Sequence, residues 1–221
     1  AMGTKKVKSV NKIVGPGSKW VALAMRSVSL EGLCGTQAAN FGPSEIMCIA
    51  DPSTSSEIVA SSMIAQSEHD VEAMAILLTK EKKMIKKVKS LITEQLKDLP
   101  RKKIASKSLN KNGILIYTNS DKKLVEIVNR LAPEHLELNL RNYKKIVNKI
   151  RNAGSIFLGK YSTEAFGDYL AGTNHVLPTS GSAKFSSGLS VYDFYKRISY
   201  INLSKKGIET LGPSVITLAN F

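Results

Sequence analysis

The 221-residue sequence predicts an α/β fold in which helices flank a parallel sheet. Strand and helix patterns alternate from Glu45 to Gly159, which is typical of a parallel sheet covered by helices. The apolar runs Ile46–Ala50 and Ala73–Leu78 have the composition of buried strands. The stretch Lys80–Leu99 places its apolar residues on one stripe of a helix, so this helix can cover a face of the sheet.

The N-terminal part predicts a strand, a turn and a helix, in that order. Val10–Val14 is apolar enough for a strand, and Lys19–Leu30 has a helical pattern. The turn between them, Gly15-Pro16-Gly17-Ser18, can contact a phosphate or a dinucleotide, because backbone N–H groups and the start of a helix favour anions. The turn lacks the six-residue glycine fingerprint, so a plain turn is the other interpretation.

The rest of the chain predicts further helices and strands from caps and periodicity. Thr54 with Glu57 three residues later forms a capping box that starts an amphipathic helix ending near Asp70. Ser120 can cap a helix over Asp121–Leu131. We also expect strands at Gly113–Tyr117, Leu136–Leu138 and Ser155–Gly159, a helix at Asn142–Arg151, a loop at Tyr161–Gly188, a short helix from Val191, a strand at Ile198–Leu203 and a last helix broken at Gly212-Pro213.

The net charge of +14 raises the possibility of nucleic-acid binding, which other features disfavour. The basic residues fit the polar faces of helices, lysine outnumbers arginine, and aromatic residues do not alternate with the basic runs. Cys34 and Cys48 lack metal-site spacing and indicate a reducing compartment. With no signal peptide and no apolar run of membrane-spanning length, we expect a cytoplasmic protein without specific nucleic-acid or membrane partners.

The three histidines lie in compact polar clusters. Gln66 and His69 are three apart on one side of a helix, a geometry that lets two ligands share one ion. The other clusters are Glu134-His135 and the stretch from Asp168 to His175. Each cluster alone is consistent with a purely structural role, such as a surface histidine or a helix cap. The clusters therefore indicate a functional site only if the fold brings them close together. We expect them at the carboxyl ends of the strands, where ligand crevices of such sheets lie.

Several of these stretches together resemble the histidinol dehydrogenase family. The matching motifs occur in family order across nearly the whole chain, and the last of them is highly specific. They are Ile13-Val14-Gly15-Pro16-Gly17, Gly42-Pro43-Ser44-Glu45, Ala65-Gln66-Ser67-Glu68-His69, Ala132-Pro133-Glu134-His135-Leu136, Gly154-Ser155-Ile156-Phe157-Leu158-Gly159 and Gly167-Asp168-Tyr169 through Gly172-Thr173-Asn174-His175-Val176-Leu177-Pro178-Thr179.

The resemblance implies a zinc- and NAD-dependent oxidation of histidinol to histidine through the aldehyde, by a homodimer. It implies that zinc is held by Gln66, His69 and Asp168. It implies that His135 takes the alcohol proton and that Glu134 activates the water that attacks the aldehyde. The remaining implied contacts are to substrate, from Ser44 and His175, and to NAD, from Gly15, Pro16, Gly17 and Ser18.

The resemblance also shows departures from the family pattern. The family is longer at both ends, and its C-terminal arm carries a further zinc-ligating histidine. Ser18 stands where asparagine is expected, and Gln37–Phe41 replaces an Ile-Asp-x-Pro-Ala pattern. We therefore expect an incomplete Rossmann-like parallel sheet flanked by helices, with a small N-terminal lobe remnant and a C-terminal helical segment. The expected regions are residues 1–45, the nucleotide-lobe remnant, residues 46–189, the Rossmann-like domain with the zinc and catalytic motifs, and residues 190–221, a helix-strand-helix segment.

Three functions stay open on the sequence. The first is histidinol dehydrogenase activity that needs the parts of the family absent from this chain. The second is a related dehydrogenase of another polar alcohol, which the altered stretch before Gly42 suggests. The third is a non-catalytic remnant that acts as a binding or scaffold protein, which the shorter length and the +14 charge suggest.

Overall fold

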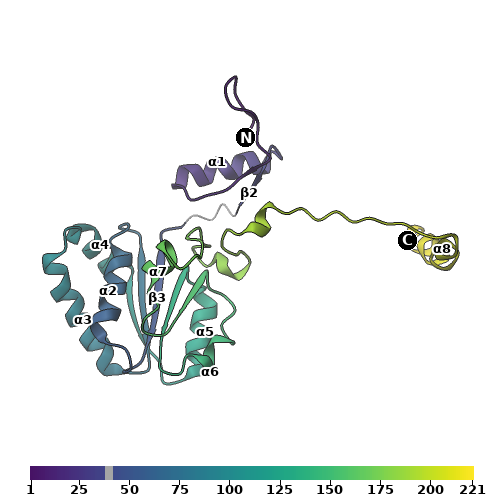
Figure 1. Ribbon diagram of the computed structural model, residues 1–221. Helices are drawn as coiled ribbons and strands as arrows, with labels where there is room; N and C mark the ends of the chain where they lie inside the picture. Colours follow the sequence, from purple (N-terminus) through teal and green to yellow (C-terminus); the bar gives the residue numbers. More distant parts are fainter. Residues whose placement is uncertain (38–41) are drawn as a thin grey trace. The chain divides into compact units, whose positions relative to one another are not determined.

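A parallel five-stranded sheet, in the order β5-β4-β3-β6-β7, forms the centre of the first of two units, Ala1–Ser190. The computed structural model describes residues 1–37 and 42–221. Figure 1 shows α2, α3 and α4 on one face of the sheet and α5 and α6 on the other. These elements are β3 (Glu45–Ala50), α2 (Ser56–Ser67), β4 (Met74–Thr79), α3 (Lys82–Gln95), α4 (Lys102–Asn112), β5 (Gly113–Tyr117), α5 (Asp121–Leu131), β6 (His135–Asn139), α6 (Lys144–Val147) and β7 (Ser155–Leu158).

Two apolar layers hold the sheet between its helices. Alternate side chains of a strand point to opposite faces, so Ile46 and Cys48 face α2 and α3, whereas Met47 and Ile49 face α5 and α6. All six residues of β3 are buried, as the continuous apolar run predicts. The expected α/β class with a parallel sheet is confirmed. The divisions that we expected after residues 45 and 189 stay predictions.

The start of α2 differs from the expected capping box. Ser55 is the N-cap, and its side chain accepts a hydrogen bond from the Glu57 amide at 3.2 Å. Thr54 is buried and donates its hydroxyl to the carbonyl oxygen of Asn139 at 3.1 Å. The capping-box prediction is wrong because Thr54 hydrogen-bonds to β6 and Ser55, not Thr54, caps the start of the helix. The cap of α5 is as expected: Ser120 accepts from the Lys123 amide at 3.4 Å.

The N-terminal stretch contains fewer paired strand residues than the sequence indicates. The strand expected at Val10–Val14 is limited to β1 (Lys12–Ile13), which pairs in parallel with β2 (Gly35–Thr36). The helix α1 (Lys19–Leu30) has the predicted bounds. The stretch Gln37–Phe41 lies outside the described residues from position 38 onward.

Two helices are shorter than predicted, and one helix lies where we expected only a loop. The stretch Lys80–Leu99 contains α3 and the 3₁₀ turn η1 (Leu96–Asp98), and Asn142–Arg151 contains only the four residues of α6. The Gly- and Ser-rich stretch Tyr161–Gly188 includes α7 (Glu164–Tyr169) and the 3₁₀ turn η2 (Ser182–Lys184). Composition alone hid α7, and this short helix carries part of the site.

The second unit, Val191–Phe221, contains the 3₁₀ turn η3 (Val191–Phe194) and the helix α8 (Lys205–Ala219). The strand expected at Ile198–Leu203 does not form; this stretch has no regular structure. The break expected at Gly212-Pro213 is also wrong, because α8 continues through Pro213. Across the described residues, no helix combines the length and the apolar character that crossing a bilayer requires.

Candidate functional site

The polar clusters converge at the amino ends of β3 and β6, not at the carboxyl ends. Glu45 is the first residue of β3, and His135 is the first residue of β6. The two strands pair with Ile46 beside His135. The expected position was wrong because these motifs precede their strands in the sequence, and His69 likewise precedes β4. The site lies on the sheet face that carries α2, because Glu137 of β6 is the register partner of Cys48.

His135 is buried, and its ring is oriented by the backbone. Its Nδ1 lies 3.1 Å from the carbonyl oxygen of Glu45, so the proton belongs on Nδ1 and the lone pair of neutral imidazole on Nε2. Nε2 is buried and has no hydrogen-bond partner within residues 1–37 and 42–221. The Asp168 carboxylate lies 3.8 Å from Nε2, which is too far for a hydrogen bond but close enough for attraction between charges. In the neutral ring, Nε2 is therefore the atom that can act as a base or a metal ligand.

Glu134 is held beside this ring by the same strand end. Its carboxylate accepts a hydrogen bond from the Glu45 amide at 2.9 Å and lies 3.5 Å from Nδ1 of His135. The Glu45 carboxylate in turn accepts from the Ser180 amide at 3.0 Å. The backbone of Glu45 thus orients both members of the predicted acid–base pair through its N–H and its carbonyl group.

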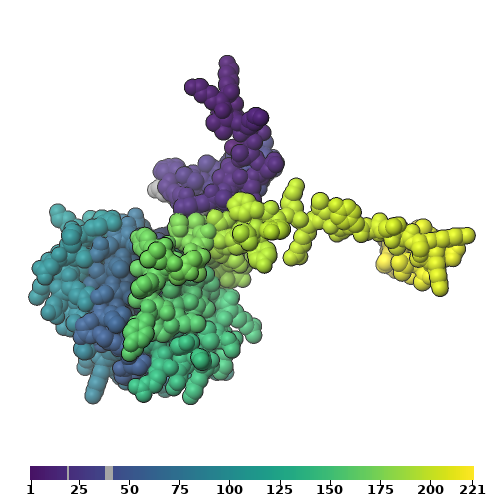
Figure 2. Space-filling view, viewed as in Figure 1, coloured from purple at the N-terminus to yellow at the C-terminus, as the bar shows by residue number. Residues whose placement is uncertain are grey.

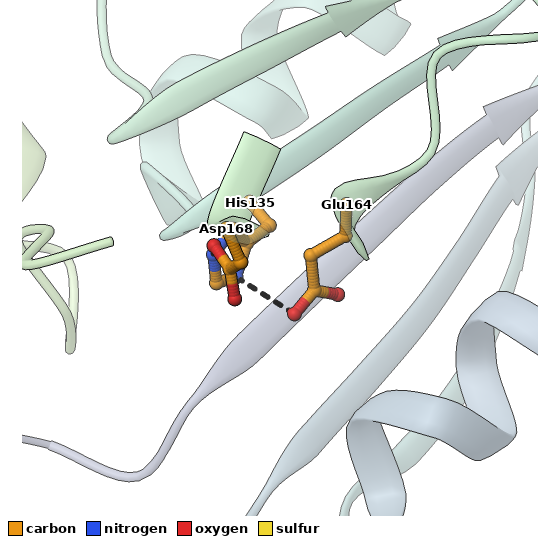
Figure 3. A group of neighbouring side chains, drawn as sticks. All are labelled: His135, Glu164 and Asp168. Atoms are coloured by element: carbon orange, nitrogen blue, oxygen red, sulfur yellow. Dashed lines mark ion pairs between the residues drawn. The ribbon is translucent and has the colours of Figure 1, made fainter. Parts of the chain in front are cut away.

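The helix α7 brings two more carboxylates to His135. Glu164 lies 3.8 Å from Nδ1, and ligand atoms of His135, Glu164 and Asp168 all lie within 4.8 Å of one another. Figure 3 shows the three side chains gathered around one point. The spacing of Glu164 and Asp168, four residues apart, puts both on the same side of the helix.

Gln66 completes the group from α2. It is fully buried, and with its amide nitrogen toward Glu164 it donates to both carboxylate oxygens, at 3.1 and 3.0 Å. The predicted ligand Gln66 therefore touches the cluster through Glu164, a residue that the sequence analysis did not single out.

Most of the other predicted residues line a hollow of about 240 Å³ next to this cluster. His69 lies just past the end of α2, where its amide donates to the carbonyl oxygen of Gln66 at 3.2 Å, and both His69 and His175 are exposed. The hollow is lined by Pro16, Gly17, Ser44, His69, Glu134, His135, Glu164, Asp168 and His175 among others. Gly15 and Ser18, the other two residues of the predicted NAD turn, are not among them.

A second hollow, of about 470 Å³, lies between α2 and α7 and shares His69, Glu164 and Asp168 with the first. Figure 2 shows the surface of the α7 region, in green, beside that of α2, in blue. The cluster is therefore reached from two hollows, although its central imidazole is buried.

Burial and mutual charge perturb the titration of the cluster. Burial raises the pKa of Glu134 and of Glu164 to about 7 each, against the opposing attraction of His135. Burial alone would lower the pKa of His135, but the carboxylates of Asp168, Glu164 and Glu134 outweigh it and raise the pKa to about 9. The same ring holds the pKa of Asp168 below its usual range, with help from His175 and His69. Such perturbed groups in a cleft are typical of functional sites.

The donor set fits a divalent cation such as zinc. Imidazole, carboxylate and amide oxygens are ligands that zinc accepts, and an open position for substrate is usual in catalytic zinc sites. Nε2 of His135 is a buried nitrogen with no partner in the described part of the chain. Asp168 lies near Nε2, and Glu134 and Glu164 lie near Nδ1 of the same ring. A cation would offset this concentration of negative charge.

Glu164 could have been found in the sequence by its spacing. Glu164 and Asp168 have i, i+4 spacing, which predicts a shared helix face. The glycine- and serine-rich composition of Tyr161–Gly188 favoured a loop and concealed this signal. Glu137 was also missed, although the alternation in His135-Leu136-Glu137-Leu138-Asn139 puts His135, Glu137 and Asn139 on one face of a strand.

The fold and the site together define an α/β protein with a buried cluster of imidazole, amide and carboxylate groups suited to a cation and to proton transfer. The family model for histidinol dehydrogenase matches residues 1–221, and the chain belongs to this family. It is 59% identical over 221 residues to histidinol dehydrogenase of Pelagibacter ubique, and the aligned region covers all of this chain and 51% of that protein. It is 45% identical over 219 residues to the Listeria monocytogenes protein of the same name, covering 99% of this chain and 51% of that protein.

A solved structure shows the same fold. The crystal structure of histidinol dehydrogenase from Elizabethkingia anophelis matches with a TM-score of 0.91 and 37% identity, covering 98% of this chain and 49% of that chain. The chain therefore spans about half the length of the relatives that it matches.

Proposed function

We propose that this chain carries the acid–base and metal-holding part of a zinc-dependent, NAD-linked histidinol dehydrogenase, which oxidises histidinol to histidine through the aldehyde. The observation that carries this proposal is the position of His135. Its Nδ1–H is held by the Glu45 carbonyl oxygen, and its Nε2 is buried without a described partner and faces Asp168. A neutral imidazole fixed in this way can accept a proton at Nε2.

His135 and Glu134 have separate roles in this proposal. His135 accepts the hydroxyl proton of the substrate at Nε2. Glu134, whose pKa of about 7 lies in the range of a general base near neutral pH, takes a proton from the water that adds to the aldehyde. Because the carboxylates of Asp168 and Glu164 help to raise the pKa of His135, neutralising them would return that pKa toward its ordinary range and free Nε2 as a base.

Gln66, His69 and Asp168 would hold the zinc ion in this proposal. Bound zinc would polarise and orient the substrate oxygen. Glu164 would keep the Gln66 amide oriented, since its two carboxylate oxygens accept from the amide nitrogen. Ser44 and His175 would contact the substrate, and both line the hollow beside His135.

The turn Gly15-Pro16-Gly17-Ser18 would contact NAD, whose nicotinamide ring would accept hydride. Two observations support this assignment. Gly15 has a φ of +125°, a conformation that favours glycine, and Pro16 and Gly17 line the same hollow as His135. Ser18 is the N-cap of α1 and makes no side-chain capping bond. A homodimer and a cytoplasmic location stay predictions.

Metal binding by the chain itself tests the zinc proposal. We expect about one zinc or cobalt ion per chain, measured by elemental analysis and by cobalt(II) absorption, and at least a tenfold weaker affinity in Asp168→Asn and His69→Ala. Asp121→Asn is the matched control, because Asp121 pairs with Lys80 at 2.6 Å outside the cluster. A folded wild-type chain that takes up no metal, or an affinity that drops equally in the control, would reject the assignment.

Activity is tested separately, with a full-length protein that contains this stretch. We expect His135→Ala and Glu134→Gln to abolish NAD reduction with histidinol. A panel of amino alcohols and diols then tests the substrate, since preference for another polar alcohol would replace histidinol in the proposal.

A further inference from the structure

Glu137 is a buried carboxylate that the proposed chemistry does not use. It lies in the middle of β6, two residues after His135 and on the same face of the sheet, and only 1% of its surface is exposed. Its oxygens lie within reach of four donors: the Glu164 amide at 3.2 Å, Asn139 Nδ2 at 3.0 Å, Ser62 Oγ at 3.3 Å and Cys48 Sγ at 3.5 Å. Each of its two carboxylate oxygens is thus the acceptor for two of these donors.

These four donors come from the elements that surround the site. Ser62 belongs to α2, four residues before Gln66, and the Glu164 amide belongs to α7. Asn139 belongs to β6 itself and Cys48 to β3. One carboxylate therefore connects the helix with Gln66, the strand with His135 and the helix with Glu164 and Asp168.

Stability alone does not explain a glutamate at this position. Burying a carboxylate carries a large desolvation cost, and well-packed apolar residues commonly replace buried charged groups without loss of stability. Its register partner Cys48 is fully buried in the apolar layer under α2 and α3, so this face of the sheet accommodates apolar side chains. What an apolar residue cannot do is accept the Glu164 amide hydrogen.

The helix α7 needs an outside acceptor to hold its first turn. It has six residues, and its N-cap Thr163 makes no side-chain capping bond. Helices this short are marginal without tertiary contacts. Glu137 accepts from the first amide of α7, and the buried Gly167 packs against Phe157 of β7. These two contacts hold α7 at two points, Glu164 and Gly167, which lie about one turn apart.

We propose that Glu137 is a positioning residue, whose carboxylate ties the first turn of α7 to β6 and α2 and so sets the spacing of Glu164, Asp168 and Gln66 around His135. The structural part of this inference, the tie to α7, is independent of the reaction. Its consequence for metal binding rests on the proposed function.

The experiment separates the length of the side chain from its charge. Glu137→Gln keeps the shape and one acceptor oxygen but removes the charge. Glu137→Asp keeps the charge but draws the carboxylate back by about 1.5 Å, one carbon–carbon bond, out of range of the Glu164 amide. Val88→Ala is the control for general destabilisation, because Val88 is a fully buried residue of α3 outside the cluster.

Two readouts are used on the full chain. In the metal-free chain we expect hydrogen exchange of the α7 amides to be about tenfold faster or more in Glu137→Asp, and near wild type in Glu137→Gln and Val88→Ala. Cobalt(II) affinity should fall about tenfold or more in Glu137→Asp and stay within about threefold in Glu137→Gln.

The result that overturns the proposal is the reverse order, or wild-type exchange and affinity in Glu137→Asp. Loss of binding in Glu137→Gln with retention in Glu137→Asp would assign Glu137 an electrostatic role instead. If wild type binds no cobalt, the proposed metal site fails, and the exchange data still decide whether Glu137 holds α7.

Discussion

Gly167→Ala should loosen the helix that carries Glu164 and Asp168. A Cβ at position 167 would lie 2.9 Å from Cζ of Phe157 and closer still to Cε1, whereas ordinary contacts begin near 3.4 Å. The Phe157 ring is 8% exposed and lies 6.1 Å from the ring of His135, so it has little room to withdraw. Either the ring or α7 must therefore move, and both movements disturb the site.

The size of the effect follows from two opposing contributions. Inserting a methyl group into a packed core costs about 1–3 kcal/mol, and alanine in a helix regains up to about 1 kcal/mol over glycine. We expect a net loss of about 1–2 kcal/mol in the free energy of unfolding, or roughly 2–8 °C in Tm. Cobalt(II) affinity should also fall, because Asp168 is the next residue on α7.

A double-mutant cycle tests this account by urea unfolding. Phe157→Leu removes the ring atoms that the new methyl group meets, so Gly167→Ala should cost about 1 kcal/mol less in the Phe157→Leu background. Gly212→Ala is the control, because a Cβ there meets nothing within 4 Å. Additive losses, with no coupling between positions 157 and 167, would refute the argument.

Three further predictions address the strand ends and the cluster. Gly154→Ala should destabilise the chain by about 1–3 kcal/mol in urea unfolding and weaken cobalt(II) binding, because the new Cβ would lie 2.6 Å from the carbonyl oxygen of Glu134. Gly35→Ala is the control: its new Cβ would have its nearest contact at 3.6 Å, so stability and cobalt(II) affinity should both stay near wild type. In the metal-free chain, the free energy of unfolding should fall as pH rises from about 4.5 to 7, because the raised pKa values of Glu134 and Glu164 make the folded state bind protons more tightly than the unfolded state. The raised pKa of His135 should extend this fall from pH 6.5 to about 9. A flat pH profile in urea unfolding would contradict this. Glu164→Gln should flatten the fall between 4.5 and 7, and an unchanged slope would show that Glu164 does not contribute.

Sequence reasoning found the sheet because its signal is local. The apolar runs of β3 and β4 and the serine cap of α5 depend on neighbouring residues, and they appear where expected. Thr54 was misassigned because its partner, Asn139, lies 85 residues away. The strand predicted at Ile198–Leu203 also failed, since a strand needs a partner that composition does not supply.

The site was predicted in its residues more fully than in its arrangement. The predicted residues Ser44, His69, Glu134, His135, Asp168 and His175 line one hollow, although the roles assigned to them stay proposals. The predicted position at the carboxyl ends of the strands was wrong, because Glu134-His135 and His69 precede their strands in the sequence and so lie at the amino ends. Local spacing places Glu164 on the helix face of Asp168 and Glu137 on the strand face of His135, but their contacts to Gln66 and to α7 appear only in the fold.

Because the Glu45 backbone makes hydrogen bonds to both Glu134 and His135, the acid–base pair forms only when β3 and β6 are correctly aligned. The Glu45 amide binds Glu134 and its carbonyl oxygen binds His135, so these contacts exist only in one register of β3 against β6. A slip of one residue would turn Leu136 toward α2 and His135 toward α5. In a refolding experiment, the fraction of chains with a protected His135 therefore counts the correctly aligned chains, and a compact but misaligned population would be detected by its missing site.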